Sequence, residues 1–434
     1  MRFFPAPFPD LSLPLLAVYA LFGRTEALQA LFFSWFLTML NPGLAPPPST
    51  AQFGRYLVLF AAVASVGMRS VSLQAGIHFR PLTLGTCLLG GFFVVHSLFV
   101  SPMVEVSALK AVSWTLAMAA TLAAWSGLDS GARDKLIGQI FAGLTALMLL
   151  SLPLLGSPLG YLRNAHGFQG VFNQPQVFGT TMALLGAWAA ARLLGSRHPS
   201  WMNVAIAAGC AMLVVLSEAR TGGLAMVLGI AAGVVSILVL RRRGVHALLP
   251  GLASPRLLFT GGSLIVVILL SGPFIADQME KFVLKRSEAT SLTEAYDRSR
   301  GALIEPMTAN IQEHPIRGIG FGIASNPHGM RVTRDPILGL PVGASVEKGV
   351  MPLAVWEELG VAGLFAVSLW LLWLIWRSIK AGIVAAVVSL TALSINMGEA
   401  VLFSPGGFGL LLLILLGWTA TARQTPRPMG EKTP

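Results

Sequence analysis

The sequence predicts an all-α polytopic membrane protein with about 12 transmembrane helices and one large outer loop that contains short helices. Two features of its composition support this fold class: 54% of the 434 residues are hydrophobic, and only 11% are charged. Soluble domains carry about 25% charged residues, so this chain has too few charges to cover a soluble surface. In addition, apolar runs close to the roughly 20-residue thickness of a bilayer recur along the chain.

The apolar runs define the individual elements. We expect membrane spans at 56–68, 81–100, 107–127, 136–155, 177–194, 201–217, 221–240, 257–276, 352–376, 381–400 and 407–422. The segment 11–40 is interrupted by Gly23-Arg24-Thr25-Glu26, and each of its two pieces is short for a full crossing. It forms either one bent span or a tight helical hairpin, which gives 12 or 13 spans in all.

The net charge of +11 follows from the expected topology and is not evidence for nucleic-acid binding. Most Lys and Arg residues stand in short clusters between apolar runs, as the positive-inside rule describes for cytoplasmic loops. With 241–243 and the tail after residue 422 on the cytoplasmic side, the alternation is consistent from residue 56 onward. This orientation places 277–350 outside. Cys87 and Cys210 both lie in apolar runs, so we expect no disulfide or zinc framework.

The segment 277–350 differs from the rest of the chain, because it is polar and holds equal numbers of basic and acidic residues. Loops of this length are usually functional or disordered. The balanced charge, together with Tyr296 and Phe321, favours an ordered cap over the membrane bundle. Within the cap, the stretch from Arg300 to Glu313 predicts a short helix that ends before Pro315 and Gly318.

Two outer arginines stand apart from the large loop. Arg220 follows Glu218 in the short link between two spans, and Gly222-Gly223 comes directly after it. Arg163 lies in the outer loop 156–176. An arginine at an interface can simply extend its head to water. Charges at membrane depth, however, often mark a substrate path, and the Glu218–Arg220 pair is of that kind.

The outer loop contains a glycine-rich turn, Gly318-Ile319-Gly320-Phe321-Gly322, that follows Arg317. No βαβ pattern surrounds this turn, so it is not a dinucleotide-binding fingerprint. It is either a flexible turn or a nest of backbone N–H groups that binds an anion. In the second case Arg298 and Arg300 would supply charge, because the planar guanidinium group suits bidentate phosphate binding.

These motifs together resemble the O-antigen ligase and O-antigen polymerase family of lipid-linked glycan transferases. The family shows a Ser-Arg-Gly-like turn opening a span, an outer arginine before a Pro, a Gly-x-Gly-x-Gly turn, and a helix with Glu-x-Gly-x-x-Gly. The similar segments here are Ser217–Gly222, Arg300 with Pro315, Gly318–Gly322 and Glu358–Gly363, and upstream Gly170–Gln176. The ordered match covers about 170–363.

The sequence departs from the family at the histidine that the resemblance implies is catalytic. That histidine would fall near 348–349, where this chain has Glu347-Lys348-Gly349. The nearest histidine is His328, which a stretch rich in Gly and Pro separates from that position. Either His328 takes the role from a shifted position, or Glu347 or Lys348 replaces it.

Two adjacent carboxylates, Glu357 and Glu358, fall near the start of the 352–376 span. They are explained either by a helix start, where the helix dipole favours negative charge, or by pairing with Arg220 or Arg300.

The resemblance implies a metal-independent glycosyltransferase of the cell inner membrane whose active site faces the periplasm. It implies no cofactor and no metal, a glycan donor on polyprenyl pyrophosphate, and a sugar hydroxyl acceptor on lipid A core or on a second lipid-linked glycan. The alternative from another class is a polysaccharide or lipid transporter, or a flippase. No internal repeat of the kind found in transporters is visible.

The resemblance also assigns roles and parts of the chain. His328 or Glu347 would be the catalytic base. The pyrophosphate would be bound by Arg220, Arg300, Arg163 and Lys348, with supporting positions at Glu218, Gly318, Gly320 and Glu358. The chain divides into transmembrane helices at 1–276, a periplasmic catalytic loop at 277–350, further transmembrane helices at 351–422 and a cytoplasmic tail at 423–434.

Overall fold

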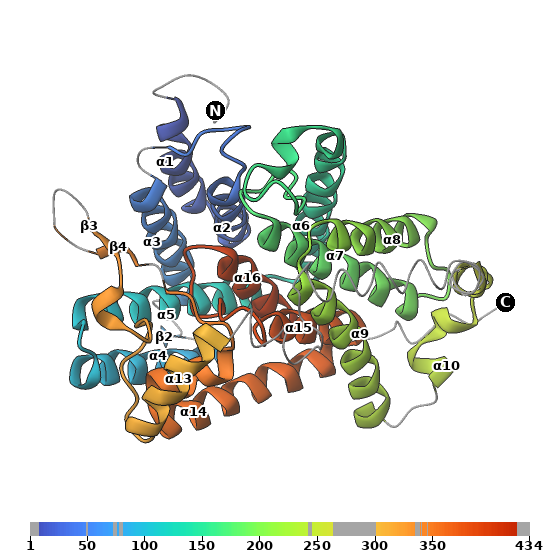
Figure 1. Cartoon of the computed structure of the whole chain (residues 1–434). Helices are drawn as coiled ribbons and strands as arrows, with labels where there is room; N and C mark the ends of the chain where they lie inside the picture. Colours follow the sequence, from blue (N-terminus) through green and yellow to red (C-terminus); the bar gives the residue numbers. More distant parts are fainter. Residues whose placement is uncertain are drawn as a thin grey trace.

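The computed structural model describes residues 8–48, 51–72, 76–77, 81–241, 245–263, 301–334, 339, 341–344 and 346–422. Within these ranges the protein is a bundle of α-helices with two short antiparallel hairpins, as Figure 1 shows. The hairpins pair β1 (Val71–Ser72) with β2 (Gly76–Ile77), and β3 (Val332–Arg334) with β4 (Pro341–Ala344). The fold class predicted from composition and apolar runs is confirmed in its main feature, which is an all-α protein.

The helices follow the apolar runs closely. The first part of the chain forms α1 (Phe8–Ala20), α2 (Arg24–Met39), α3 (Ala51–Ser70), α4 (Pro81–Val100), α5 (Val104–Gly127), α6 (Ser130–Ser151), α7 (Pro175–Gly195), α8 (Trp201–Leu216), α9 (Arg220–Arg241) and α10 (Val245–Leu248). The second part forms α13 (Ala302–Glu313), α14 (Met351–Ala381), α15 (Ile383–Ile395) and α16 (Phe408–Thr421). Short 3-10 helices are η1 (Leu152–Gly156), η2 (Pro158–Tyr161), η3 (Pro250–Ala253) and η5 (Pro327–Gly329).

Six helical segments of the described chain are long and apolar enough to cross a membrane: Pro81–Val100, Val104–Gly127, Ser130–Gly156, Pro175–Gly195, Arg220–Arg241 and Met351–Ala381. Three apolar helices, α8, α15 and α16, have 13 to 16 residues and are shorter than a full crossing. These helices are those of a membrane protein. The count of about 12 spans stays a prediction, and the span expected at 257–276 lies outside the described residues beyond 263.

The structure decides between the two alternatives for the segment 11–40, and it shortens one expected span. The segment 11–40 forms two helices, α1 and α2, so the hairpin is the correct alternative; the turn is held by Arg69, which donates to the carbonyls of Leu21 and Phe22. The span expected at 381–400 ends early, at Ile395. There the side chain of Asn396 accepts the N–H groups of Val401 and Leu402 and turns the chain.

The centre of the bundle is α16. All 14 of its residues are buried, and it packs against α2, α5, α14 and α15. A helix that is apolar on every side is buried either in a protein core or in lipid, and α16 is buried among other helices.

Arginines cap helix ends at one end of the bundle. Arg24 donates to the carbonyls of Arg69 and Gly127, Arg133 to that of Thr421, Arg377 to that of Ala420, and Arg241 to those of Ile379 and Lys380. The last carbonyls of a helix have no partner within the helix, and in a membrane such a group is costly when left unbonded. Arg241, which belongs to one of the basic clusters used above to infer a cytoplasmic side, is therefore also bonded to a helix terminus. Which side of the membrane this end faces stays a prediction.

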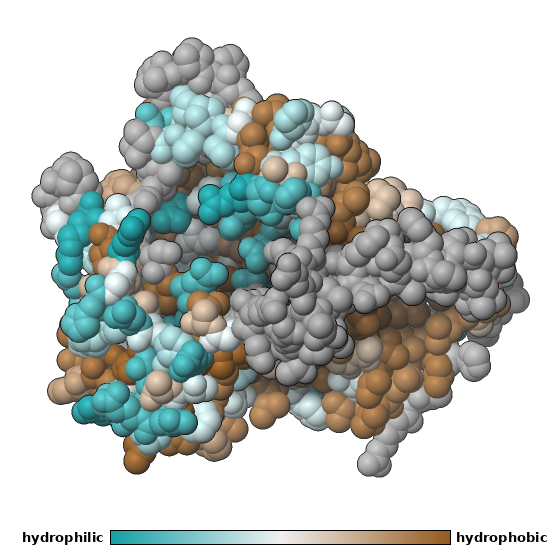
Figure 2. Space-filling view, viewed as in Figure 1, coloured by the Kyte–Doolittle hydropathy of each residue, from teal (hydrophilic) through white to brown (hydrophobic). Residues whose placement is uncertain are grey.

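The opposite end of the bundle carries the polar cap. The predicted short helix is confirmed as α13, and it lies along α14 in Figure 1. Figure 2 shows hydrophilic residues gathered where β3, β4 and α13 lie, whereas hydrophobic residues dominate around α9. The exposed large apolar side chains of α9 are Leu224, Val227, Leu228, Val235, Val239 and Leu240. Such a division suits a bundle whose flank meets lipid and whose end meets water.

Cysteine labelling tests the orientation. With Cys87 and Cys210 replaced by alanine, a cysteine at Glu313 and a cysteine at Arg197 should react with a membrane-impermeant maleimide from opposite sides of the membrane. Both positions are exposed, so the reagent can reach them. Labelling of both from the same side would overturn the placement of the large loop outside.

Candidate functional site

The polar end is organised around a break in α14. At Gly360 the backbone leaves the helical region, with φ +66° and ψ −172°. The break releases the carbonyl groups of Glu357 and Glu358 from the helix ladder. They accept the N–H groups of Ile319 and Gly320, each at 2.9 Å, and the N–H of Val361 donates to the carbonyl of Pro315 at 3.1 Å. The glycine-rich turn is therefore paired, strand-like, with the broken helix.

Glycine is required where these two segments meet. Gly318, Gly320 and Gly322 have φ of +67°, +115° and +67°, a region that other residues rarely adopt. A Cβ at Gly360 would lie 1.8 Å from the carbonyl oxygen of Ile316. Hence the turn is a docking element and not a flexible loop.

The turn also binds an anion, but that anion belongs to the chain itself. The N–H of Gly322 donates to Oε2 of Glu358 at 2.6 Å, while the N–H groups of Ile319 and Gly320 are used by carbonyls. The nest considered in the sequence analysis for an external phosphate therefore holds a carboxylate of α14.

A buried ion-pair network lies beneath the turn. Nζ of Lys348 is 2.7 Å from Oε2 of Glu357 and 3.0 Å from Oε1 of Glu358. Nδ2 of Asn310, on α13, donates to Oε1 of Glu357 at 2.7 Å. Glu357 is 0% exposed, so it is held by these partners and not by water. Among the described residues, the cation paired with the two carboxylates is thus Lys348, and not Arg220 as one alternative held.

The turn is anchored on α4 and α5 as well. The ring of Phe321 stacks on Phe93 with centroids 4.5 Å apart, and Ser107 donates its hydroxyl to the carbonyl of Phe321. Nε2 of His96 lies 2.7 Å from the carbonyl oxygen of Arg317. The segment 315–322 is therefore fixed on two sides, by α14 and by the α4–α5 pair.

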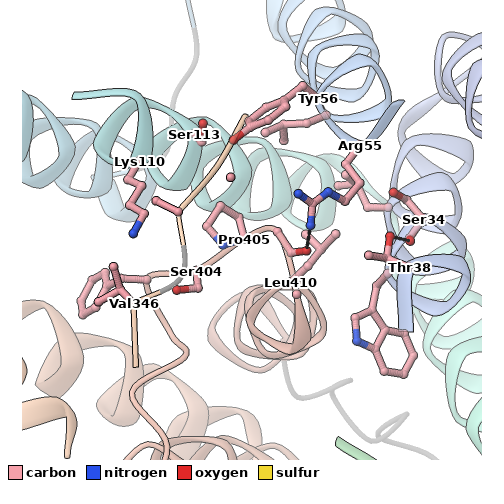
Figure 3. A pocket seen from close by; sticks show the side chains of 18 residues that line it. Ser34, Thr38, Arg55, Tyr56, Lys110, Ser113, Val346, Ser404, Pro405 and Leu410 are labelled. Atoms are coloured by element: carbon pink, nitrogen blue, oxygen red, sulfur yellow. Dashed lines mark hydrogen bonds between the residues drawn. The ribbon is translucent and has the colours of Figure 1, made fainter. Parts of the chain in front are cut away.

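A pocket of about 220 Å³ opens beside this network. Its walls come from α2, α3, α5, the segment leading into α16, and β4 (Figure 3). Two cations reach into it: Arg55, which donates to the carbonyl of Gly406, and Lys110, whose Nζ donates to the carbonyl of Gly322 at 2.8 Å. The other polar side chains that line it carry hydroxyl groups: Ser34, Thr38, Tyr56, Ser113 and Ser404.

A second cavity of about 30 Å³ connects the pocket with the ion pairs. It shares Lys110, Val346, Phe403 and Ser404 with the larger pocket, and Lys348 and Glu358 line its other side. The hairpin that carries β4 is fastened to α5 by an ion pair between Arg334 and Glu105, and this hydrogen-bonded carboxylate raises the pKa of Arg334. Four charged residues from different parts of the chain therefore line these two adjoining cavities: Arg55, Lys110, Lys348 and Glu358.

The structure brings the Arg220 turn to the same end. Glu218 has φ +54°, which turns the chain sharply into α9, where Arg220 is the first residue. A Cβ on Gly398 would meet the side chain of Thr221, and two residues further the N–H of Ala400 donates to the carbonyl of Lys348 at 3.1 Å. The Arg220 turn is thus linked to the ion-pair network through the segment 398–400, which contacts Thr221 at one position and is bonded to Lys348 at another.

The remaining expected residues are less tightly placed. Arg163 is exposed in a loop whose Phe168 donates its N–H to the carbonyl of Leu216, near the Arg220 turn. His328, in η5, and Glu347 are both exposed, and neither side chain makes a hydrogen bond or ion pair with the part of the chain that the structure describes. Arg298 and Arg300 lie outside that part. The choice between His328 and Glu347 as base therefore stays open.

The sequence analysis did not single out Arg55 or Lys110. A signal existed for Lys110, because it falls inside the span expected at 107–127, and a lysine within a span is costly unless it has a function or a partner. Arg55 directly precedes a span, where many arginines occur for topological reasons alone.

Models of known protein families and curated proteins give no match to this chain.

The docking of the turn predicts a sharp glycine effect. Gly360→Ala should destabilise the protein by at least about 1–3 kcal/mol, since strain at a positive φ alone costs that much and the clash with Ile316 adds to it. Thermal unfolding of purified protein in detergent measures the loss. Gly91→Ala is the control, because a Cβ there, on α4, meets no atom within 4 Å. Equal melting of Gly360→Ala and wild type would disprove the docking.

The ion-pair network predicts a large cost for removing its cation. Lys348→Met should destabilise the protein by about 3–5 kcal/mol, because it leaves two carboxylates buried without their cation. Glu347→Gln, one residue away and exposed, should change stability by less than about 0.5 kcal/mol. Adding Glu357→Gln to Lys348→Met should recover part of the loss, because one buried charge is removed. No recovery, or a mild Lys348→Met effect, would contradict the pairing.

Proposed function

We propose that this protein is a metal-independent membrane glycosyltransferase of the O-antigen ligase and polymerase type. It moves a glycan from polyprenyl pyrophosphate to a sugar hydroxyl at the outer, periplasmic face of the inner membrane. The observation that carries the proposal is that two motifs of the resemblance, the glycine turn and the Glu358–Gly363 segment, are bonded to each other at one end of the bundle, and that the Arg220 turn lies at the same end. Gly318–Gly322 is bonded directly to Glu357 and Glu358, and the Arg220 turn approaches the segment bonded to Lys348.

In the proposed reaction the acceptor hydroxyl loses its proton to the base, His328 or Glu347. The acceptor oxygen forms a bond to the anomeric carbon of the donor sugar while the bond from that carbon to the pyrophosphate oxygen breaks. The polyprenyl pyrophosphate departs with the negative charge. Arg220 and Arg300 stabilise that charge, assisted by Arg163, because fixed cations act most strongly where charge develops in the transition state.

Lys348 and Glu358 have a supporting role in this scheme. The ammonium of Lys348 is already neutralised by two carboxylates, so its strongest effect is to hold Glu357 and Glu358 under the glycine turn. A contact between Lys348 and the pyrophosphate remains a prediction. The two carboxylate oxygens of Glu358 are engaged, Oε1 by Lys348 and Oε2 by the N–H of Gly322, so this side chain is a poorer candidate for the base than an exposed group.

Analysis of surface glycans from a deletion strain tests the reaction class. Loss of chain length identifies a polymerase, and loss of attachment to lipid A core identifies a ligase. Complementation by Arg220→Ala or Arg300→Ala should show transfer reduced by two or more orders of magnitude, about the loss of one oxyanion donor. Arg317→Ala is the matched control, since this arginine is exposed at the turn. Unchanged glycans in the deletion strain would reject the proposal.

The base is identified by comparing His328→Ala with Glu347→Gln. Only the true base should abolish transfer while donor binding stays intact, because a general base acts in the transition state. Binding of lipid-linked donor and transfer are therefore measured on the same purified variants. Retained transfer in both would place the base at another residue.

A further inference from the structure

The pocket beside the ion-pair network has an excess of positive charge. Arg55 and Lys110 line it, and none of its 18 lining residues is acidic. Arg55 and Lys110 each donate to one backbone carbonyl, and within the described residues neither forms an ion pair with a carboxylate. Nε of Arg55 is buried without a hydrogen-bond partner. A cationic side chain placed in this way is costly unless something else satisfies it.

The neighbouring carboxylates do not cancel this excess. Glu357 and Glu358 carry two negative charges, while Lys348, Lys110 and Arg55 carry three positive charges. Glu358 lines the smaller neighbouring cavity, and its oxygens are already engaged by Lys348 and by the N–H of Gly322. Among these described residues, one positive charge therefore has no carboxylate to balance it.

The first turn of α16 adds to the positive potential. Gly406, Gly407 and Leu410 line the pocket, and Gly407 makes no side-chain cap on the helix N-terminus. The first N–H groups of a helix lack partners within it, and the helix dipole places a partial positive charge there. The guanidinium of Arg55, the ammonium of Lys110 and this N-terminus face the same cavity, as Figure 3 shows for the two side chains.

The remaining walls are apolar and belong to helices of the bundle. Leu31 and Trp35 from α2, Leu59 from α3, and Phe403 before α16 form most of them. Hydroxyl groups of Tyr56 and Ser113 supply donors between these surfaces, whereas the hydroxyl of Thr38 donates to the carbonyl of Ser34. An oxyanion attached to an apolar chain matches such walls better than a free, fully hydrated ion does.

We propose that this pocket is a binding site for the phosphate group of a membrane lipid, with Arg55 and Lys110 as the residues that bind the phosphate oxygens. The site is separate from the Arg220 turn, because neither Arg220 nor any of its neighbours lines the pocket. If transfer occurs as proposed above, the protein therefore holds two lipid-borne anions, one at each site. The binding itself does not depend on that reaction.

Binding to full-length protein in neutral-lipid nanodiscs tests the site with four probes: a polyprenyl monophosphate, the matching polyprenol, phosphatidylglycerol and inorganic phosphate. We expect the lipid phosphates to bind, and the polyprenol and inorganic phosphate to bind at least about tenfold more weakly. Comparison of the two lipid phosphates identifies which lipid the site prefers. Arg55→Gln and Lys110→Met should each weaken lipid-phosphate binding by about tenfold or more, the loss of one charge-assisted hydrogen bond.

Two further variants guard against an effect on folding. Thr38→Trp leaves both cations in place and fills the cavity, so it should also weaken binding by about tenfold or more. Lys135→Met removes an exposed cation from the opposite end of the bundle and should leave binding unchanged. Wild-type affinity in Arg55→Gln, Lys110→Met and Thr38→Trp would overturn the proposal. Equal binding of inorganic phosphate and lipid phosphate would overturn its lipid part.

Discussion

A helix within a membrane normally satisfies its own backbone, and α14 departs from this rule at Gly360. The carbonyl groups released there are bonded by Ile319 and Gly320, which fixes the glycine turn. The fixed turn presents the N–H of Gly322 to Glu358, and Glu358 together with Glu357 holds Lys348. Lys348 in turn is tied through its carbonyl to Ala400, in the segment that leads to α16. One break in one helix thus connects the outer cap, the buried charges and the centre of the bundle.

The helices could be predicted from sequence because their signal is local. A run of apolar residues reports burial in a bilayer directly, and Pro315 with Gly318 marks the end of α13 in the same local way. The early end of α15 was missed, because the turn at Asn396 depends on a side chain bonding to residues five and six positions later. The hydrophobicity of the sequence carries no information about those side-chain hydrogen bonds.

The partners within the site could not be predicted for a different reason. Glu357 and Glu358 were expected to start a helix or to pair with an arginine, and Lys348 was assigned to pyrophosphate. Their pairing depends on how the segment just before α14 folds back, so that Lys348 reaches carboxylates nine and ten positions further along in the helix. Similarly, the glycine pattern indicated a positive-φ turn but not its acceptor, because the acceptor lies about 40 residues further along. Types of residue can be read locally, whereas partners across the fold cannot.

Positive charge has two distinct uses in this bundle. At one end, Arg24, Arg133, Arg241 and Arg377 donate to the terminal carbonyls of helices. At the other end, Lys348 is neutralised by carboxylates, while Arg55 and Lys110 face a cavity. Net charge alone does not distinguish these uses. The surroundings of each cation, which are helix termini, carboxylates or a cavity, do.

The central position of α16 has a consequence for how the protein is made. This helix follows every other described helix in the chain, so the ribosome delivers it after the helices that surround it have entered the membrane. Until then the inward faces of α2, α5, α14 and α15 lack α16, the helix against which they pack. The inward faces of these helices therefore gain their contacts with α16 last, and Arg55 at one end and Arg133 and Arg377 at the other then bond to its flanks. Assembly of the pocket is thus a late step in the folding of the bundle, because Gly406, Gly407 and Leu410, at the start of α16, form part of its wall.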